Sequence, residues 1–294
     1  MGMRFLWCML CGLGVIGCFP VRPSAPVHPV TARFNKPIGA GPKVVVARSA
    51  IPPRPASPVD APRATTCDIS GIRFEGVAFD ARSHRLIVAD QPAGPGTRWP
   101  DAAAAATAHG GLAAINAGFF TPAGQPLGRL VVAGSPAGSW NRASSLGSGV
   151  WLEAASGTSA ICRREAVPAV VAAQELIQAG PMLIERHQVV SGLEATKASV
   201  RSIIFWDGGT RWWLGRASPC TLAALAHALA AVSPAAWPVC DALNLDGGRS
   251  ADLCITSAIP GGPLTRRSPW NRPVRNFLVL LKSNPVSNSS DYSP

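Results

Sequence analysis

Residues 71–80, GIRFEGVAFD, and residues 84–90, HRLIVAD, carry the apolar alternation of β-strands and are joined by a short turn. A similar strand-like pattern of apolar residues recurs in eight later segments, and the sequence therefore predicts a large sheet. The later strands are expected at residues 112–116, 127–133, 149–153, 181–185, 201–206, 211–215, 242–246 and 275–282. Asp207-Gly208-Gly209, between two of them, predicts a tight turn.

Two helices are expected among these strands. DAAAAATAH (residues 101–109) is alanine-rich, can be capped by Asp101 and stops at a Gly-Gly pair. TLAALAHALAAV (residues 221–232) begins with Thr221 as an N-cap and repeats its leucines at helical spacing. Because strands dominate and the helices are irregularly placed, the sequence predicts an α+β fold. A mixed, largely antiparallel sheet would pack with a few helices in a single domain.

The first 18 residues predict an exported protein. They give a basic residue, Arg4, followed by an apolar run too short to span a bilayer comfortably, which is typical of a signal peptide. The last four residues resemble a lipobox, which would place a lipid anchor on Cys18; a plain signal peptide cut a few residues later explains the same run. The protein is therefore expected to be periplasmic, or anchored to the outer membrane as a lipoprotein.

The charge of the chain is concentrated near its start. The Pro-rich residues 19–66 contain seven Arg or Lys and a single acidic residue, within a total formal charge of +11. No nucleic-acid motif accompanies this charge, so the segment is interpreted as a solvated, disordered linker and no nucleic-acid partner is expected. The folded domain is expected over residues 67–283, and the polar residues 284–294 are expected to be a disordered tail.

Five cysteines lie outside the leader: Cys67, Cys162, Cys220, Cys240 and Cys254. In an oxidising compartment an odd number predicts one or two disulfides and a leftover thiol, with Cys220 and Cys240 a plausible pair flanking one helix. The CxxC in the leader has no second pair at metal spacing. The sequence therefore predicts no metal and no cofactor.

Two segments place small residues and a polar group at strand ends. In AINAGFF (residues 114–120) a strand runs into Asn116 and Gly118 allows a sharp turn; alone, this also fits a buried amide in a turn. In ALNLDGGRSADL (residues 242–253) strand alternation predicts that Asn244 and Asp246 share one face. The following positions add close backbone approach, charge and hydrogen-bonding groups: Gly247, Gly248, Arg249, Ser250 and Asp252. A simple hairpin turn needs only the glycine pair, so a ligand site is favoured.

A third segment, RPVRNFLVL (residues 272–280), places Arg272, Arg275 and Asn276 before an apolar strand. Arginine presents a planar fork that suits phosphate oxygens, although arginines at a strand start are often surface features. Another arginine, Arg201, precedes the strand in RSIIFWD (residues 201–207).

Taken in order, six blocks resemble the signature blocks of the phosphodiester glycosidase (NAGPA-like) family, over about residues 67–283. They are AINAGFF, PLG (126–128), QAGPMLI (178–184), RSIIFWD, ALNLDGGRSADL and RPVRNFLVL. The family usually continues the LDGG motif with a third glycine and serine; here Arg249 replaces the glycine and Ser250 is retained. Ala117 stands where the family more often has glycine.

The resemblance implies hydrolysis of a sugar-1-phosphodiester, or a phosphoglycan, to free sugar and phosphomonoester. The second pKa of a phosphomonoester is about 6, so this leaving group needs little protonation. The hypothesis makes Asp246 the nucleophile or base, with Arg275 and Arg201 holding the phosphate and Asn116 bonding the sugar or phosphate. Glu75 or Asp252 would supply a second acid. Further substrate contacts are expected from Gly118, Asn244, Gly247, Gly248, Ser250 and Asn276.

Three other functions compete with this one. A calcium site at Asp246, Ser250 and Asp252 lacks the ligand spacing of an EF-hand. A serine hydrolase at Ser148 lacks the first glycine of a nucleophile elbow. A non-catalytic module that binds envelope polysaccharide is the main alternative, because a fold can outlive its chemistry. Convergence of Asp246, Asn116, Arg201 and Arg275 on one concave pocket would favour the enzyme, whereas scattering them beyond a side chain's reach would refute it.

Overall fold

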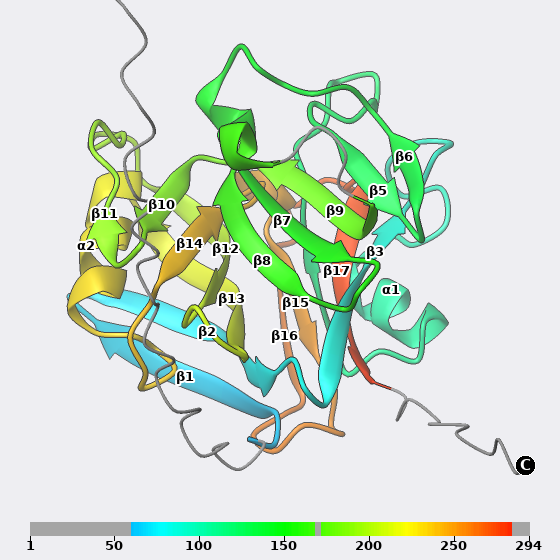
Figure 1. Cartoon of the computed structure of the whole chain (residues 1–294). Helices are drawn as coiled ribbons and strands as arrows, with labels where there is room; N and C mark the ends of the chain where they lie inside the picture. The colour runs from blue at the N-terminus through cyan, green and yellow to red at the C-terminus, as the bar shows by residue number, and fades with distance from the viewer. Residues whose placement is uncertain (1–59, 168–171, 284–294) are drawn as a thin grey trace, which may run out of the picture. The chain divides into compact units, whose positions relative to one another are not determined.

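Three antiparallel sheets make up the protein in the computed structural model, which describes residues 60–167 and 172–283 (Figure 1). The expected signal peptide, lipobox and tail, and most of the expected linker, lie outside these residues. Every ladder between described strands is antiparallel, and the described residues belong to one compact unit.

The strand order of each sheet mixes distant parts of the chain. The seven-stranded sheet has the order β1 (Arg63–Ile69), β2 (Ile72–Asp80), β13 (Arg211–Cys220), β12 (Ser199–Trp206), β14 (Asp241–Asn244), β10 (Met182–Glu185) and β11 (Gln188–Val189). The central five-stranded sheet has the order β16 (Leu264–Arg267), β15 (Asp252–Ile255), β4 (Ala113–Asn116), β17 (Asn276–Lys282) and β3 (His84–Asp90). The upper five-stranded sheet has the order β6 (Ser135–Ala137), β5 (Leu130–Val132), β9 (Ala173–Ala179), β7 (Gly149–Ala154) and β8 (Ser159–Arg163).

One apolar core fills the space between the three sheets. Val77 and Leu214 enter it from the seven-stranded sheet, Ile115 and Leu278 from the central sheet, and Trp151 from the upper sheet. All five side chains are almost completely buried. Because side chains alternate along a strand, each sheet also has an outer face that needs its own cover.

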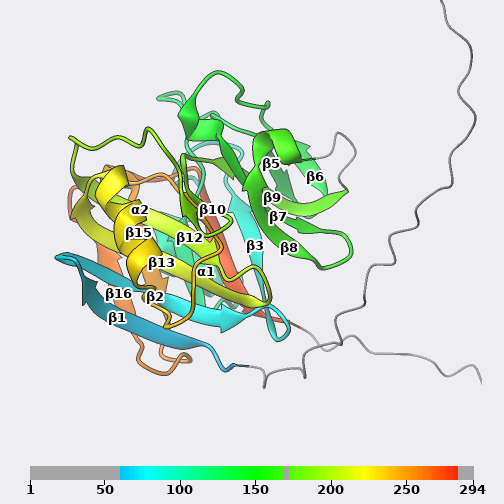
Figure 2. The ribbon, with the colours of Figure 1, turned by 60° about the vertical axis from the view of Figure 1, so that its left-hand side comes forward.

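The two helices cover the outer faces of two sheets (Figures 1 and 2). Helix α2 (Leu222–Ala231) packs on the seven-stranded sheet and helix α1 (Ala102–Ala108) on the central sheet. The predicted N-caps are confirmed: the Asp101 carboxylate accepts from the Ala104 amide at 2.8 Å, and the Thr221 hydroxyl from the Ala224 amide at 3.1 Å. Neither helix is long and apolar enough to cross a membrane, nor is any other in the described part of the chain.

The predicted fold class needs correction in two respects. The strands form three sheets instead of one and pair only antiparallel where the structure describes them, so the domain is richer in β-structure than an α+β fold. Strands β2 and β3, adjacent in sequence, enter different sheets because β2 pairs with β1 and β13 while β3 pairs with β17. The predicted turn at residues 207–209 is confirmed, since Trp206 lies opposite Trp212 across it.

Several strands were not predicted from the sequence. They are β1, β6, β8, β9, β11, β15 and β16. Strand β1 begins at Arg63, inside the segment expected to be linker, and its alternation of exposed and half-buried residues marks it as an edge strand. The regular part of the domain therefore starts before Cys67.

The expected disulfide between Cys220 and Cys240 is wrong, because all five cysteines of the described residues are free thiols. Cys220 ends β13 opposite Ser199. The Cys240 sulfur lies beside Gly208, 3.1 Å from where a Cβ there would sit, at the other end of the same hairpin. The ten residues of β13 separate the two ends, well beyond the roughly 7 Å between Cα atoms that a disulfide spans.

A buried glutamate, Glu175, joins the upper sheet to the edge of the central sheet. Its Oε2 accepts from the Val88 amide of edge strand β3 at 2.9 Å, and its Oε1 from the Ala133 amide at 3.2 Å. The side chain is almost fully buried and lies directly opposite Glu153 in the ladder. Burial, reinforced by the Glu153 charge, raises the pKa of Glu175 to about 7.

This raised pKa predicts a pH dependence of stability. A carboxyl group whose pKa is higher in the folded state favours folding when protonated, so the free energy of unfolding falls as pH rises from about 4.5 to about 7. The contribution of Glu175 is up to about 3 kcal/mol. In Glu175→Gln, the free energy of unfolding in urea should decline less between pH 4.5 and 7.5 than in wild type. The variant should also be less stable by a constant amount at every pH, because one N–H group then faces the side-chain NH₂. Glu185→Gln, at a partly exposed ion pair with Arg163, is the control. Parallel curves for Glu175→Gln and wild type would contradict this assignment.

Candidate active site

Asn116, at the end of β4, joins the segments on which the candidate site is built. Its Nδ2 donates to the Asp246 carbonyl, and its Oδ1 accepts from the Ser202 hydroxyl at 2.7 Å and from the Asp252 amide at 3.0 Å. The Asp246 amide donates to the Ala117 carbonyl at 2.9 Å, which holds the Asp246 turn against the end of β4. The side chain is completely buried, so these contacts form without competition from water.

The Asp246 carboxylate lies just beyond β14 and is only 6% exposed. Its Oδ2 receives no hydrogen bond from any residue that the structure describes. Burial raises the pKa of Asp246 to about 6, although the Ser250 hydroxyl and the Arg272 charge act in the opposite direction. A carboxylate with this pKa is mostly ionised at pH 7 and is more basic than an ordinary aspartate, which suits a catalytic base.

Arg272 is the arginine that faces Asp246. Its Nη2 lies 3.9 Å from Asp246 Oδ2, and its Nε donates to the Ser250 hydroxyl at 3.2 Å. The guanidinium also lies 4.7 Å from the centre of the Phe120 ring. With its side chain 48% exposed, Arg272 keeps donors available to an anion from solvent. In the sequence Arg272 stands near a strand start, but the hypothesis gave the phosphate to Arg275 and Arg201.

Arg275 is committed to a buried ion pair. It binds Asp90 through two parallel hydrogen bonds of 2.7 and 3.0 Å and donates to the Gly124 carbonyl at 2.7 Å. Both partners of the pair are about 5% exposed. Breaking such a pair leaves an uncompensated buried charge, so the structure gives Arg275 a structural role.

Arg201 is not brought to Asp246. It alternates along β12 with Ser202, which binds Asn116, and therefore points to the opposite face, toward α2. There its guanidinium donates to the carbonyls of Cys220 at 3.0 Å and Lys197 at 2.8 Å. Of the four residues expected to converge, only Asn116 and Asp246 do so.

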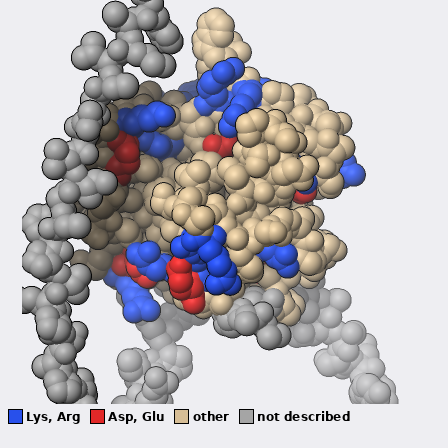
Figure 3. Space-filling model, turned by 90° about the horizontal axis from the view of Figure 1, so that it is seen from above, with Lys and Arg blue, Asp and Glu red and all other residues tan. Residues whose placement is uncertain are grey.

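Many arginines of the domain lie next to acidic groups, as Arg275 does. On the face shown in Figure 3, the basic side chains lie in separate small groups, several beside Asp or Glu, instead of one continuous patch. The contact between Arg272 and Asp246 differs from these pairs, because at 3.9 Å it is an ion pair without a hydrogen bond.

Asn244 and the two glycines shape the turn that carries Asp246, and Asn244 Oδ1 is a buried acceptor without a partner among the described residues. Strand β14 ends at Asn244, whose Nδ2 donates to the carbonyls of Gly180 and Leu245, both at 2.9 Å. A Cβ at Gly247 would lie 2.6 Å from the Val200 carbonyl oxygen, and Gly248 has a φ of +60°. The glycines therefore allow the turn to pack against β12.

Gly118 and Asn276 form a second small polar contact next to the turn. The Gly118 amide donates to Asn276 Oδ1 at 2.7 Å, and the Ala117 amide to the Asn276 carbonyl at 3.1 Å. Asn276 is completely buried, yet its Nδ2 has no hydrogen-bond partner among the described residues. A buried donor without a partner is rare and is a candidate contact for a bound group.

The two expected second acids are both held by arginines. Glu75, on β2, accepts from Arg266 at 2.8 Å. Asp252 accepts from Arg267 at 2.9 Å and from the Ala102 amide at 3.0 Å, which ties it to the start of α1. The carboxylates of Asp246 and Asp252 therefore point to different partners.

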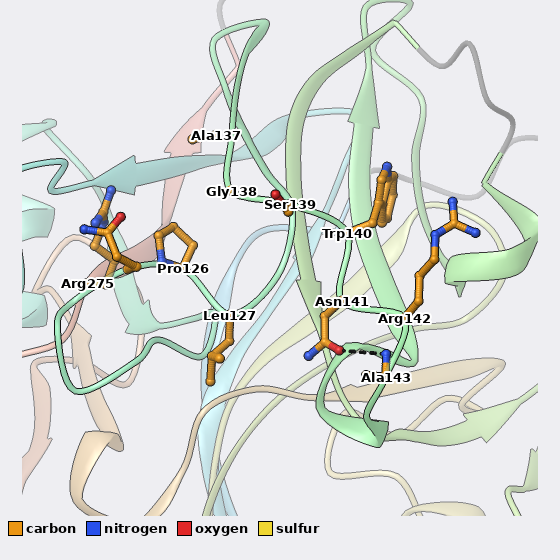
Figure 4. A pocket seen from close by; sticks show the side chains of 11 residues that line it. Pro126, Leu127, Ala137, Gly138, Ser139, Trp140, Asn141, Arg142, Ala143 and Arg275 are labelled. Carbon is orange, nitrogen blue, oxygen red and sulfur yellow. Dashed lines mark hydrogen bonds between the residues drawn. The ribbon is translucent and has the colours of Figure 1, made fainter.

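A cavity of about 600 Å³ reaches this part of the domain at Arg275 (Figure 4). It is lined by residues 125–127, residues 137–143 and Arg275. Phe120, under the Arg272 guanidinium, forms a β-bridge with Pro126 in the cavity wall. The segment between them thus connects the surroundings of Asp246 to the cavity.

The phosphodiester glycosidase (NAGPA) family model matches residues 109–281, more than half of the chain. The chain therefore belongs to the phosphodiester glycosidase family. This segment contains all of the site residues described above except Glu75, Asp90 and Ala102. No curated protein sequence matches the chain.

Two solved structures share the fold at low sequence identity. The catalytic domain of zebrafish N-acetylglucosamine-1-phosphodiester alpha-N-acetylglucosaminidase, auto-inhibited by its pro-peptide, is 19% identical, with a TM-score of 0.52 over 77% of this chain and 84% of that chain. A hypothetical protein from Synechocystis is 18% identical, with a TM-score of 0.53 over 74% of this chain and 61% of that chain.

The contacts of Asn116 predict a large loss of stability on truncation. In Asn116→Ala the Ser202 hydroxyl, the Asp252 amide and the Asp246 carbonyl each lose a buried partner. We expect the free energy of unfolding in urea to fall by about 3 to 5 kcal/mol, since each unsatisfied buried group costs about 1 to 3 kcal/mol. Ser202→Ala removes only one of these bonds and should lose about 1 kcal/mol. Equal losses in the two variants would contradict the central role of Asn116.

Proposed function

We propose that this chain is an exported hydrolase that cleaves a sugar-1-phosphodiester, of the N-acetylglucosamine-1-phosphodiester type, to free sugar and phosphomonoester. The observation that carries the proposal is the buried Asp246 carboxylate with a free oxygen beside the half-exposed Arg272. Membership of the phosphodiester glycosidase family supports it. So does the printed substrate class of the zebrafish protein that shares the fold.

Asp246 acts as the base in this mechanism. Its ionised carboxylate accepts a proton from a water molecule, the water oxygen bonds to the anomeric carbon, and the bond from that carbon to the phosphate oxygen breaks. A base with a pKa of about 6 is ionised at neutral pH and still has useful proton affinity. Direct attack by water would invert the anomeric carbon, so the anomer formed first distinguishes this mechanism from a covalent one.

Arg272 binds the phosphate in this proposal. Its guanidinium is already positioned by Ser250 and by the Phe120 ring, so little side-chain ordering remains when an anion binds. The charge that develops on the departing phosphate is stabilised by the same guanidinium. The Asn276 amide lies next to the turn as a further donor for the sugar or phosphate.

A second acid is not required. A phosphomonoester with a second pKa of about 6 leaves as an anion at neutral pH. Glu75 and Asp252, which the sequence suggested for this role, instead form ion pairs with Arg266 and Arg267. The proposal therefore uses one carboxylate and one arginine.

One observation favours the alternative, a non-catalytic module that binds envelope polysaccharide. Arg201 and Arg275, which were expected to complete the phosphate site, do not face Asp246. The cavity of about 600 Å³ at Arg275 could then hold glycan without hydrolysis. Turnover separates the two functions.

Sugar release should require the Asp246 carboxylate. Purified wild type should release free sugar from an N-acetylglucosamine-1-phosphodiester, with kcat/KM rising through about pH 6 and level above it, because the base must be ionised. Asp246→Asn should lower kcat by about 10² to 10⁴-fold. Asp207→Asn, in the other Asp-Gly-Gly turn, is the matched control. A rate that declines above pH 6 would show that Asp246 acts as an acid, and no release by wild type, with polysaccharide binding intact, would support the binding module.

Substitution of Arg272 and of Arg201 should affect turnover differently. Arg272→Gln should lower kcat/KM by about 10² to 10³-fold at unchanged stability, because the side chain is half exposed and meets the substrate. Arg272→Lys should recover only part of this, since an ammonium is a point charge without the planar fork. Arg201→Gln should leave kcat and KM near wild type. A larger effect at Arg201 than at Arg272 would refute the assignment of the phosphate to Arg272.

A further inference from the structure

Trp270 is the most exposed large hydrophobic residue of the described chain, at 77%. Exposing an indole to water is unfavourable, because a tryptophan buries roughly 150 to 250 Å² when covered. Its ring stacks on no other aromatic ring in the part of the chain that the structure describes. A single exposed apolar residue can occur without a function, so its surroundings decide its meaning.

The backbone around Trp270 is fixed to the Asp246 turn. Arg249 Nε donates to the Trp270 carbonyl at 3.0 Å, and the Arg272 amide donates to the Arg249 carbonyl at 3.0 Å. Asn271 Nδ2 donates to the Ala251 carbonyl, and its amide to the Ser268 carbonyl at 3.0 Å. The segment 268–272 is thus held to the turn that follows Asp246 by bonds from Trp270 itself and from the two residues after it.

This attachment fixes the backbone of Trp270 close to that of Arg272. Trp270 precedes Arg272 by two residues, which limits the backbone separation to about 7 Å. Arg272 in turn lies 3.9 Å from Asp246. An exposed aromatic residue on a fixed backbone, two positions before an arginine that faces a carboxylate, has the composition of a ligand subsite: one apolar platform with a few polar groups.

We infer that Trp270 forms a subsite that stacks against a pyranose ring on the leaving-group side of the phosphate. The inference rests on the proposed function and adds to it a residue that determines specificity. Sugar rings present an apolar face of C–H groups that covers an indole, while their hydroxyl groups remain in water. The leaving-group side follows from Arg272, which holds the phosphate between Asp246 and the segment that carries Trp270.

A membrane surface fits this part of the protein less well. Interfacial binding draws on a broad apolar face together with basic residues. The other exposed large hydrophobics of the described chain are Leu127, Leu146 and Val232, and none of them belongs to the segment 268–272. The single aromatic ring of Trp270 is suited to contact with one sugar ring.

The experiment compares two diesters of N-acetylglucosamine-1-phosphate with the full chain. One carries a methyl group as the leaving-group substituent and the other a β-glucose trisaccharide. Trp270→Ala should raise KM about 10-fold for the trisaccharide diester, leave kcat unchanged and leave both constants unchanged for the methyl diester. Trp270→Phe should retain part of the preference. Arg249→Ala, which releases the Trp270 carbonyl, should change KM in the same direction. Because the indole is exposed, the thermal midpoint of Trp270→Ala should match wild type.

Binding provides a readout that does not depend on turnover. The trisaccharide phosphomonoester should quench the tryptophan fluorescence of Asp246→Asn, and Trp270→Phe in that background should remove most of the change. If wild type shows no turnover but this binding requires Trp270, the subsite stands and the proposed hydrolysis fails. The subsite would be overturned if Trp270→Ala changed KM equally for both diesters. It would also be overturned if the substitution left trisaccharide binding unchanged. Sedimentation of Trp270→Ala with anionic phosphatidylglycerol vesicles tests for a membrane contact. If this variant no longer sediments with the vesicles as wild type does, while its trisaccharide binding is unchanged, Trp270 contacts a membrane and the subsite is overturned as well.

Discussion

The buried amide of Asn116 is the contact on which the site depends. A single planar group donates to the turn that carries Asp246 and accepts from Ser202 and from the Asp252 amide. These partners come from the seven-stranded sheet, from the turn after β14 and from the start of β15 in the central sheet. A carboxylate in place of the amide has no donor for the Asp246 carbonyl, and a serine is too short to reach all three partners. The position therefore requires asparagine for geometric reasons before any contact with substrate is considered.

The two pairings of arginine with aspartate in this part of the fold show how stability and reactivity differ. Arg275 and Asp90 meet through two short parallel hydrogen bonds and satisfy each other inside the protein. Arg272 approaches Asp246 only to 3.9 Å, and half of the arginine side chain remains in water. A bidentate pair at Asp246 would lower its pKa and occupy the donors needed for an anion. The raised pKa of Asp246 follows from burial that the ion pair offsets only in part.

The sequence revealed those parts of the fold and site that depend on local pattern. Long strands such as β2 and β17 alternate or run apolar over many residues, whereas β6 and β11, with three and two residues, are too short to show a period. Asn116 and Asp246 were predicted because glycines follow them at strand ends. Arg201 could not be placed, because both faces of β12 are apolar and buried, and nothing local shows which face meets the second sheet. Choosing Arg272 over Arg275 required the partner Asp90, which lies 185 residues away in the chain.

The hydrogen bonds between the Asp246 turn and the segment 268–272 bear on the substrate specificity of this family member. Arg249 occupies the position at which the family motif usually has glycine, and its side chain holds the Trp270 carbonyl. Its own carbonyl holds the amide of Arg272, the residue that faces Asp246. Glycine at position 249 would keep the second bond, made by the backbone, and lose the first, made by the side chain. The Arg249 side chain therefore adds order at the tryptophan without altering the backbone contact that positions the Arg272 guanidinium. Recognition of the distal part of a substrate can change at this position while the geometry around the reacting bond stays the same.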